Sequence, residues 1–349
     1  AGHSRAFAVM AGAAVISIIA HPILPDAMFW TAIRVLSGFS VAGCYTLIES
    51  WLQAKISNEN RGRLFSAYRI VDMSGQIMAN AIIATLTPAS YISYNIIGIV
   101  MCFAILPLAL TQSKEPELAE TARYEPFFAY RVSPLAAFGV IVAGLSTATF
   151  GSVGPIFAIA VGLNLSQIAL FLVVSVIGGM ISQVPAGILA DRLSRRSVLL
   201  VYSIMASALC LAMMLPIMDL RVMGIPLVYV MSFLFGLTTY PIYSICAAHA
   251  SDFVESDRMI SLSASLIFLF ASGAIISPLV AGWIIDRFGA PMMFSLISAA
   301  HLSLMLYTVY RNFSRPAEAR RRYAYIPRTS LFIASILRPR RRNGKSRDL

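Results

Sequence analysis

The chain has 349 residues, of which 58% are hydrophobic and only 12% are charged, about half the charged share of ~25% found in soluble domains. Its net charge of +11 would fit a nucleic-acid-binding protein. The apolar residues, however, form repeated blocks of about 20 residues, the length of a membrane-spanning helix. The composition excludes an ordinary soluble domain and predicts an all-α polytopic membrane protein, because in lipid each backbone N–H needs a partner within its own segment.

Ten apolar blocks follow one another along the chain. We expect helices over 6–24, 29–52, 64–86, 91–111, 135–158, 166–190, 197–217, 225–248, 260–285 and 291–310. A polar segment separates the first four helices from the last six. The expected organisation is an incomplete N-terminal bundle in 1–111, a cytoplasmic central loop in 112–134, a six-helix C-terminal bundle in 135–310 and a basic cytoplasmic tail in 311–349.

The basic residues gather on one side of the membrane. Nearly all of the 27 lysines and arginines fall in the tail, in loops on the side of residue 1 or at a helix mouth there, whereas Arg221 and Arg287 fall on the other side. An excess of positive charge marks the cytoplasmic side, so both termini are expected in the cytoplasm. The charge then records topology, and no contact with nucleic acid is needed to explain it.

The two parts of the chain resemble each other. Gly38 precedes Arg61 by almost the same number of residues as Gly236 precedes Arg258, and each arginine opens a helix. Parallel repeats of this kind are typical of transporters built from two bundles around an axis along the membrane normal. If the parts are repeats, the first lacks two helices, and we expect the sequence to be the later part of a twelve-helix protein.

The stretch GILADRLSRR, at 187–196, places one acid and three arginines between two apolar blocks. It resembles the signature loop of the major facilitator superfamily, G-x-L-A-D-R-x-G-R-[RK], which joins the second and third helices of each six-helix half. The stretches GMISQVPAGILADR (179–192), GLTTYPIYS (236–244) and RGRLFSAY (61–68) resemble the YcaD-like branch of that family. The resemblance implies the major facilitator fold, two six-helix bundles with the first incomplete here, and secondary active transport by alternating access.

The signature stretch also predicts a gating latch. A carboxylate at a helix end can face the positive N-terminus of a neighbouring helix, and arginines can bond carboxylates or terminal carbonyls across the interface between the bundles. We expect such contacts to form when the cytoplasmic side is closed and to break when it opens. The residues assigned to the latch are Gly187, Asp191, Arg192, Arg195 and Arg196. The alternative is a short cytoplasmic loop that simply collects arginines.

Glu49 is assigned to the same latch. It lies near the end of the helix that holds Arg34, too far along the axis to pair with that arginine. Its expected partner is an arginine of the matching loop in the first part of the chain. The alternative is a carboxylate that is simply solvated at the membrane surface.

Charged residues within a membrane span are costly and usually functional. Arg34, Gly38, Tyr45 and Glu49 share one face of their helix, and the R-x-x-x-G of Arg34 to Gly38 resembles the motif on the family's fourth helix. We expect Arg34 and Tyr45 to line the substrate pathway, with Arg34 supplying a fixed positive charge. The alternative is that Arg34 extends to the membrane surface.

A polar stripe marks the third block. Tyr68, Asp72, Gln76 and Asn80 recur every four residues, and such a stripe must face water or protein, because lipid would leave it without hydrogen bonds. Asp72 lies about two turns inside the helix, where desolvation would suit it to carrying a proton. An ion pair with Arg69 is the alternative. The family resemblance supplies no acid at this position.

The second part of the chain offers neutral polar groups. Tyr240, Pro241 and Tyr243 predict a kink with hydroxyl donors near mid-membrane, and Gln183 adds an amide. We expect Gln183, Tyr240 and Tyr243 to line a polar, aromatic and nearly uncharged wall of the substrate pathway. Small and hydroxylated residues that serve close helix packing are the alternative.

No enzymatic constellation is present in the sequence. It has no phosphate-binding loop, no metal-ligand spacing and no nucleophile motif, so we expect no enzyme activity, no cofactor and no metal. The sequence predicts a monomeric transporter of a small organic solute in a bacterial inner membrane, with the lipid bilayer, the substrate and a proton as partners. The alternatives are a non-transporting receptor or scaffold of the same fold, or a drug efflux antiporter.

Overall fold

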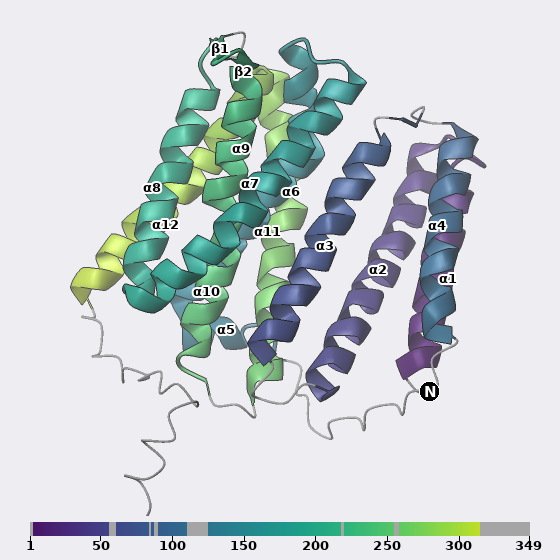
Figure 1. Cartoon of the computed structure of the whole chain (residues 1–349), viewed down its shortest axis with the longest axis horizontal. Helices are drawn as coiled ribbons and strands as arrows, with labels where there is room; N and C mark the ends of the chain where they lie inside the picture. The colour runs from purple at the N-terminus through teal and green to yellow at the C-terminus, as the bar shows by residue number, and fades with distance from the viewer. Residues whose placement is uncertain are drawn as a thin grey trace, which may run out of the picture.

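A computed structural model of the chain describes residues 3–55, 61–83, 85–86, 90–109, 125–217, 220–254 and 258–314. Within these ranges each of the ten predicted segments is helical, which confirms the all-α architecture (Figure 1). The helices of the first part are α1 (His3–Ala20), α2 (Ala27–Lys55), α3 (Arg61–Ile83) and α4 (Tyr91–Ala109). Those of the second part are α5 (Phe128–Val132), α6 (Pro134–Ala160), α7 (Leu165–Arg192), α8 (Arg195–Met213), α9 (Leu227–Thr239), α10 (Pro241–Ser251), α11 (Met259–Phe288) and α12 (Met293–Ser314), with a 3-10 turn at Ala290–Met292.

Two features of the second part go beyond the sequence expectation. The end of the predicted central loop is not irregular, since it forms the short helix α5. Strands β1 (Arg221–Val222) and β2 (Ile225–Pro226) form an antiparallel hairpin whose turn residues Met223 and Gly224 both have positive φ, 51° and 82°. Positive φ at both central residues is typical of a type I′ turn. Both elements are too short to leave a hydrophobic period in the sequence.

Seven helical stretches in the described part of the chain are long and apolar enough to cross a membrane. They comprise α2, α6, α7, α8, α11, α12 and the stretch formed by α9 and α10 together. Two shorter apolar helices, Ser4–Ala20 and Tyr91–Pro107, lie in α1 and α4. The remaining predicted span is α3, whose lower hydropathy reflects its basic first turn and its polar stripe.

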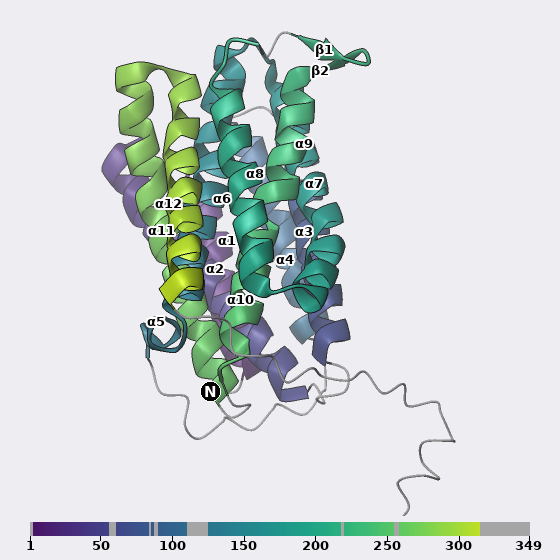
Figure 2. The ribbon, with the colours of Figure 1, turned by 90° about the vertical axis from the view of Figure 1, so that its left-hand side faces the viewer.

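The helices run alternately up and down, with α3 between two groups (Figure 1). On one side α1 packs against α2 and α4, and on the other side α6 to α12 pack together, while α3 lies along α7. The start of α1 and the end of α12 are at the same end of the molecule, called here the terminal end, and the β1–β2 hairpin is at the opposite end (Figures 1 and 2).

Side-chain caps begin the helices that carry the second part of the chain. Ser133 caps α6, which has Pro134 at its first position, and Ser194 caps α8. Asn164 and Gln167 form a reciprocal capping box at the start of α7. Each cap satisfies backbone N–H groups that the helix leaves without partners, so the short turns between helices end at fixed residues.

The second part has two hydrophobic clusters, one above the other. The cluster nearer the terminal end, called the inner cluster, includes Leu135, Cys246 and Leu262. The outer cluster is built around stacked rings, with Phe150 4.1 Å from Phe235 and 4.9 Å from Phe171 between centroids. Helix α9 contributes to the outer cluster and α10 to the inner one, so the break between these two helices lies at the boundary of the clusters.

Glycine pairs set the closest helix contacts. A methyl group on Gly236 of α9 would overlap the Ser175 carbonyl of α7, and one on Gly178 of α7 would overlap the Phe233 carbonyl of α9. Gly144 and Gly273 are related in the same way between α6 and α11. Without side chains at these positions the backbones touch, which maximises van der Waals contact where lipid removes the hydrophobic drive for helix association.

The substitution Gly236→Ala tests this contact. We expect it to lower the stability of the second part by about 1–3 kcal/mol through overpacking, against a gain of about 1 kcal/mol in helix propensity. The readout is the thermal unfolding midpoint of the purified chain in detergent. The matched control is Gly282→Ala, because nothing lies within 4 Å of the position its methyl group would occupy. Equal midpoints for the two variants would contradict the packing account.

Candidate functional site

A carboxylate with two neutral donors lies between α2 and α3. The Tyr45 hydroxyl donates to Asp72 Oδ1 at 3.1 Å, and the Gln76 side-chain amide donates to Asp72 Oδ2 at 3.4 Å. Tyr45 comes from α2, whereas Asp72 and Gln76 are one turn apart on α3. The structure therefore brings together three of the residues that the sequence assigns to the substrate and proton pathway.

The depth of this site follows from helix geometry. At 1.5 Å per residue, Asp72 lies about 16 Å from the start of α3 and Tyr45 about 15 Å from the end of α2, and both of those helix ends are at the terminal end. Tyr45 lies within the apolar stretch Ala27–Ile48, so the Tyr45–Asp72–Gln76 site lies within the length of α2 that is apolar enough to cross a membrane. Asp72 is half-buried, and Tyr45 and Gln76 are exposed, so the site is accessible from the surface of the described helices.

The three side chains can serve either charge state of the carboxylate. With Asp72 ionised, both neighbours act as donors, as observed. With Asp72 protonated, the Tyr45 hydroxyl or the Gln76 carbonyl oxygen can accept the new O–H, because each side chain has acceptor capacity.

The other predicted residues of the first part are placed less completely. Arg34 is exposed on α2, and the Gly38 Cβ position one turn later is open. Asn80 is half-buried at the end of the stripe. The side chains of Tyr68, Arg69 and Glu49 lie outside the described residues, so the pairing of Arg69 with Asp72 and the role of Glu49 stay predictions.

A second polar pair lies in the other group of helices. Ser244 of α10 donates to Gln183 Oε1 of α7 at 3.0 Å. A pocket of about 90 Å³ opens beside this pair, with walls made by small side chains. Its lining residues are Gln183, Ala186, Gly187, Ala190, Ser244, Ile245 and Ala248. Gly187 therefore belongs to a neutral pocket, and a Cβ at this position would meet no atom within 4 Å.

Tyr240 and Tyr243 make their described ring contacts with neighbouring helices. The helix is interrupted at Tyr240, where α9 ends and Pro241 begins α10, although the backbone of Tyr240 keeps helical angles, φ −62° and ψ −35°; the interruption lies where the sequence predicts a kink. The ring of Tyr240 lies against Gly179 of α7, and the half-buried ring of Tyr243 packs edge-on against Phe270 of α11 at 5.6 Å. Their role in a substrate pathway stays a prediction.

An ion pair closes the signature stretch onto α10. Arg195, at the first position of α8, bonds Asp252 Oδ1 at 3.1 Å, and its side chain is 16% exposed against 39% for Asp252. Arginines at the N-terminus of a helix are opposed by the helix dipole. A carboxylate placed here offsets that repulsion, and the bond ties the α7–α8 turn to the end of α10.

Bonds of the signature arginines across the interface between the bundles stay a prediction. The described bond of Arg195 lies within one group of helices, since Asp252 follows α10 in the same group as α8. The physical reason is the two-residue turn after Arg192, which holds the start of α8 beside the end of α10. The side chain of Asp191 lies outside the described residues, and Arg192 is exposed while Arg196 is half-buried.

Two acidic residues of the described site were missed by the sequence analysis. Asp252 directly follows α10, and Glu125 lies in the expected central loop just before α5 and bonds Arg131 and Arg258. Both are ordinary loop acids in the sequence, so only their position after or before a span could have marked them. No group of three His, Cys, Asp or Glu side chains suited to a metal ion occurs among the residues that the structure describes.

Comparisons with known proteins agree with the geometry. The family model described as Major Facilitator Superfamily matches residues 136–342. An uncharacterized MFS-type transporter from Enterobacter sp. (strain 638) is 26% identical over 281 residues, which cover 79% of this chain and 71% of the relative. The uncharacterized MFS-type transporter YcaD from Escherichia fergusonii is 22% identical over 291 residues, with coverage of 82% and 74%.

Solved structures share the fold at low sequence identity. The nucleoside transporter NupG gives a TM-score of 0.70 at 13% identity, covering 89% of this chain and 83% of that one. A D-xylose-proton symporter gives a TM-score of 0.66 at 13% identity, covering 88% and 80%. At such identities the likeness extends to the fold alone.

A double-mutant cycle tests the Arg195–Asp252 pair. We expect Arg195→Gln and Asp252→Asn each to destabilise the purified chain, and the double variant to lose less than the sum, with a coupling of about 0.2–1 kcal/mol for a partly exposed pair. Thermal unfolding in low salt is the measurement, and the coupling should shrink in high salt. Strict additivity at low salt would show that the two side chains do not interact.

Proposed function

The chain belongs to the major facilitator superfamily, and from that premise we propose that it is a proton-coupled secondary transporter of a small organic solute. The observation that carries the proposal is the Asp72 carboxylate, held between α2 and α3 by Tyr45 and Gln76, about 16 Å along α3 from its start. An ionisable group at this depth is costly and rarely kept without a role. Its hydrogen-bond partners accommodate the protonated and the ionised form alike.

Two groups of polar side chains would form the solute site. The Tyr45–Asp72–Gln76 site and the Gln183–Ser244 pair come from different groups of helices and lie at comparable depth, about 10–16 Å from the terminal end by helix rise. Together they offer hydroxyl, amide and carboxylate groups among apolar walls. Such a site suits a small neutral or cationic solute with several hydrogen-bonding groups, because Asp72 repels an anion when it is ionised. Arg34, nearer the opposite end of α2, would attract an anionic group instead.

The signature stretch would act as the latch of alternating access. Arg195 and Asp252 tie α8 to the end of α10, and Asp191 and Arg192 stand at the end of α7 beside them. In this proposal Gly187 and the turn that follows it form the surface on which the other bundle closes. Arg196 and Glu49 add charges to the same closing surface.

The setting follows from the same premise. The chain is an integral membrane protein, and its YcaD-like relatives come from enteric bacteria. We place it in the bacterial inner membrane as a monomer, with both termini in the cytoplasm, because the basic residues gather at that side.

The substitution Asp72→Asn tests proton coupling. We expect loss of solute-dependent proton movement, because Asn cannot carry a proton, while downhill exchange of the solute continues. The chain is reconstituted in liposomes that contain a pH-sensitive dye, and pools of monosaccharides, nucleosides, amino acids and amines are added outside. The solutes of a pool that shifts the internal pH are then labelled, and both their exchange and their accumulation are measured.

The matched control is Asp26→Asn, since Asp26 caps the start of α2 through Phe29 N–H at 2.8 Å and Asn caps equally well. It should leave both activities unchanged. Proton movement that persists in the Asp72→Asn variant would remove Asp72 from the coupling step. If no pool moves protons or solute in the unsubstituted chain, the non-transporting alternative gains support.

Charge exchange tests the latch. We expect Asp252→Arg alone to reduce transport at least several-fold while leaving membrane insertion intact, because like charges then meet at the start of α8. The exchange Arg195→Asp with Asp252→Arg should restore part of the rate, and initial uptake rate normalised to protein in the membrane is the measurement. Asp191→Asn should also reduce transport several-fold. Full transport in Asp252→Arg would rule out this ion pair as part of the latch.

A further inference from the structure

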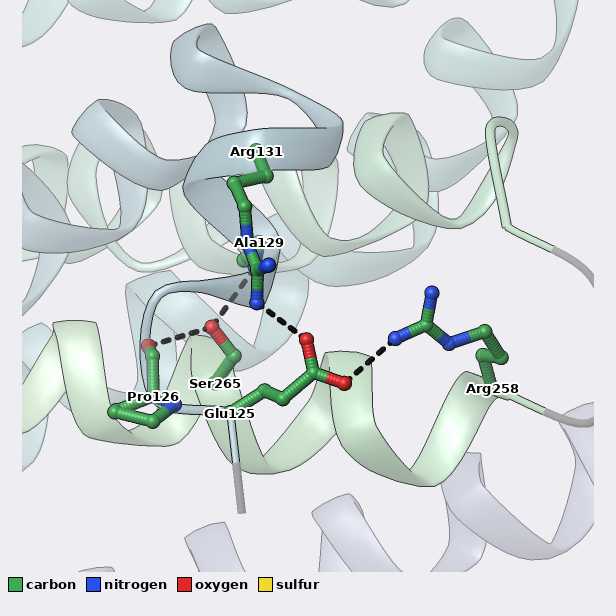
Figure 3. A network of polar contacts seen from close by, with 6 residues as sticks. All are labelled: Glu125, Pro126, Ala129, Arg131, Arg258 and Ser265. Atoms are coloured by element: carbon green, nitrogen blue, oxygen red, sulfur yellow. Dashed lines mark hydrogen bonds and ion pairs between the residues drawn. The ribbon is translucent and has the colours of Figure 1, made fainter. Parts of the chain in front are cut away.

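The short helix α5 is held against the start of α11 by a polar network (Figure 3). The Ser265 hydroxyl donates to the Pro126 carbonyl at 2.7 Å and accepts the Ala129 N–H at 2.9 Å. Glu125 accepts from Arg258 at 2.7 Å and also from Arg131. These contacts fix both the position and the rotation of α5.

The fixed rotation turns an aromatic and basic face outward. Phe127, Tyr130 and Arg131 are spaced three and four residues apart, so they share one face, and they are 58%, 59% and 63% exposed. The opposite face buries Phe128 and Ala129 in the inner cluster. Two exposed aromatic rings on a helix whose opposite face is buried indicate that lipid or a partner molecule covers them.

The position of α5 beside the ends of the membrane spans indicates that lipid covers this face. Ser265, its anchor, and Phe268, whose ring meets Phe127 edge-on at 5.7 Å, both lie inside the stretch Ser261–Phe288 that is apolar enough to cross a membrane. Helix α5 itself ends just before the span Pro134–Ala160. The outward face of α5 thus lies at the boundary where headgroups meet acyl chains, at the terminal end of the molecule (Figure 2).

The charge of the described network favours an anionic headgroup. Among its described residues, Arg131 and Arg258 carry two positive charges against the one carboxylate of Glu125, a net charge of +1. Each guanidinium has five N–H donors, more than its bond to Glu125 uses. Arg258 also stacks on the Phe128 ring, 4.1 Å from its centroid, which holds its guanidinium in place.

We propose that the face formed by Phe127, Tyr130 and Arg131, with Phe268 beside it, binds an anionic phospholipid. Arg131 takes the phosphate group, with Arg258 as the neighbouring charge, and the aromatic rings contact the upper part of an acyl chain. Glu125 does not bind the lipid; it orients the two arginines. The site is separate from the Tyr45–Asp72–Gln76 site, so it stands whether or not that site carries protons.

Purified full-length chain in a neutral detergent tests the proposal through native mass spectrometry, with phosphatidylglycerol and phosphatidylcholine as probes. We expect phosphatidylglycerol to bind more tightly, and Arg131→Gln to weaken it about fivefold, the equivalent of ~1 kcal/mol for one basic residue at an anionic surface. The variant Glu125→Gln also breaks the network, but it removes a negative charge. We therefore expect it to keep or strengthen the binding of phosphatidylglycerol.

The two variants separate a lipid site from a structural network. If Arg131→Gln and Glu125→Gln weaken lipid binding equally, or if both lipids bind alike, the proposal fails.

Glycerol phosphate is the third probe in the same binding measurement. If this soluble headgroup binds as tightly as phosphatidylglycerol does, the site is assigned to free phosphate instead. Arg221→Gln, in the hairpin at the opposite end, is the control and should change nothing. If Glu125→Gln fails to fold, Tyr130→Ala replaces it. We expect Tyr130→Ala to bind both lipids more weakly, and unchanged binding of both lipids would contradict the proposal.

Discussion

Direct backbone contact between helices holds the second bundle in shape, at Gly178 and Gly236 between α7 and α9 and at Gly144 and Gly273 between α6 and α11. In a bilayer, lipid chains are as apolar as leucine, so helices associate through close packing and polar bonds rather than through the hydrophobic effect. The polar bonds of the second bundle add to this packing. The Gln183–Ser244 pair joins α7 to α10, the helix that follows α9, and the Arg195–Asp252 bond joins α8 to the end of α10.

The first part of the chain is joined to that bundle through α3. This helix packs along α7 and is connected to α2 by the Tyr45–Asp72 bond. The candidate coupling carboxylate is therefore on the element that contacts both groups of helices. Under the proposed proton coupling, a change in the bonding of Asp72 would act on the Tyr45–Asp72 bond between α2 and α3.

The sequence predicted what depends on local periodicity and missed what depends on packing. The span positions, the interruption at Pro241 and the stripe from Tyr68 to Asn80 follow from residue spacing alone, and the family followed from the signature stretch. That Tyr45 meets Asp72 depends on how α2 and α3 lie side by side, which no spacing encodes. The partner of Arg195 was missed for the same reason, because Asp252 is distant along the chain and looks like any loop acid. Helix α5 was hidden because five residues are too few for a period.

The break at Tyr240 has a mechanical consequence. Phe235 before it is packed in the outer cluster, and Ile242 after it is packed in the inner one, while Pro241 removes the N–H that would carry the helix through. The other helices of the bundle contribute residues to both clusters, whereas α9 and α10 each contribute to one. A bend at Pro241 would therefore leave each of these two helices packed in its own cluster.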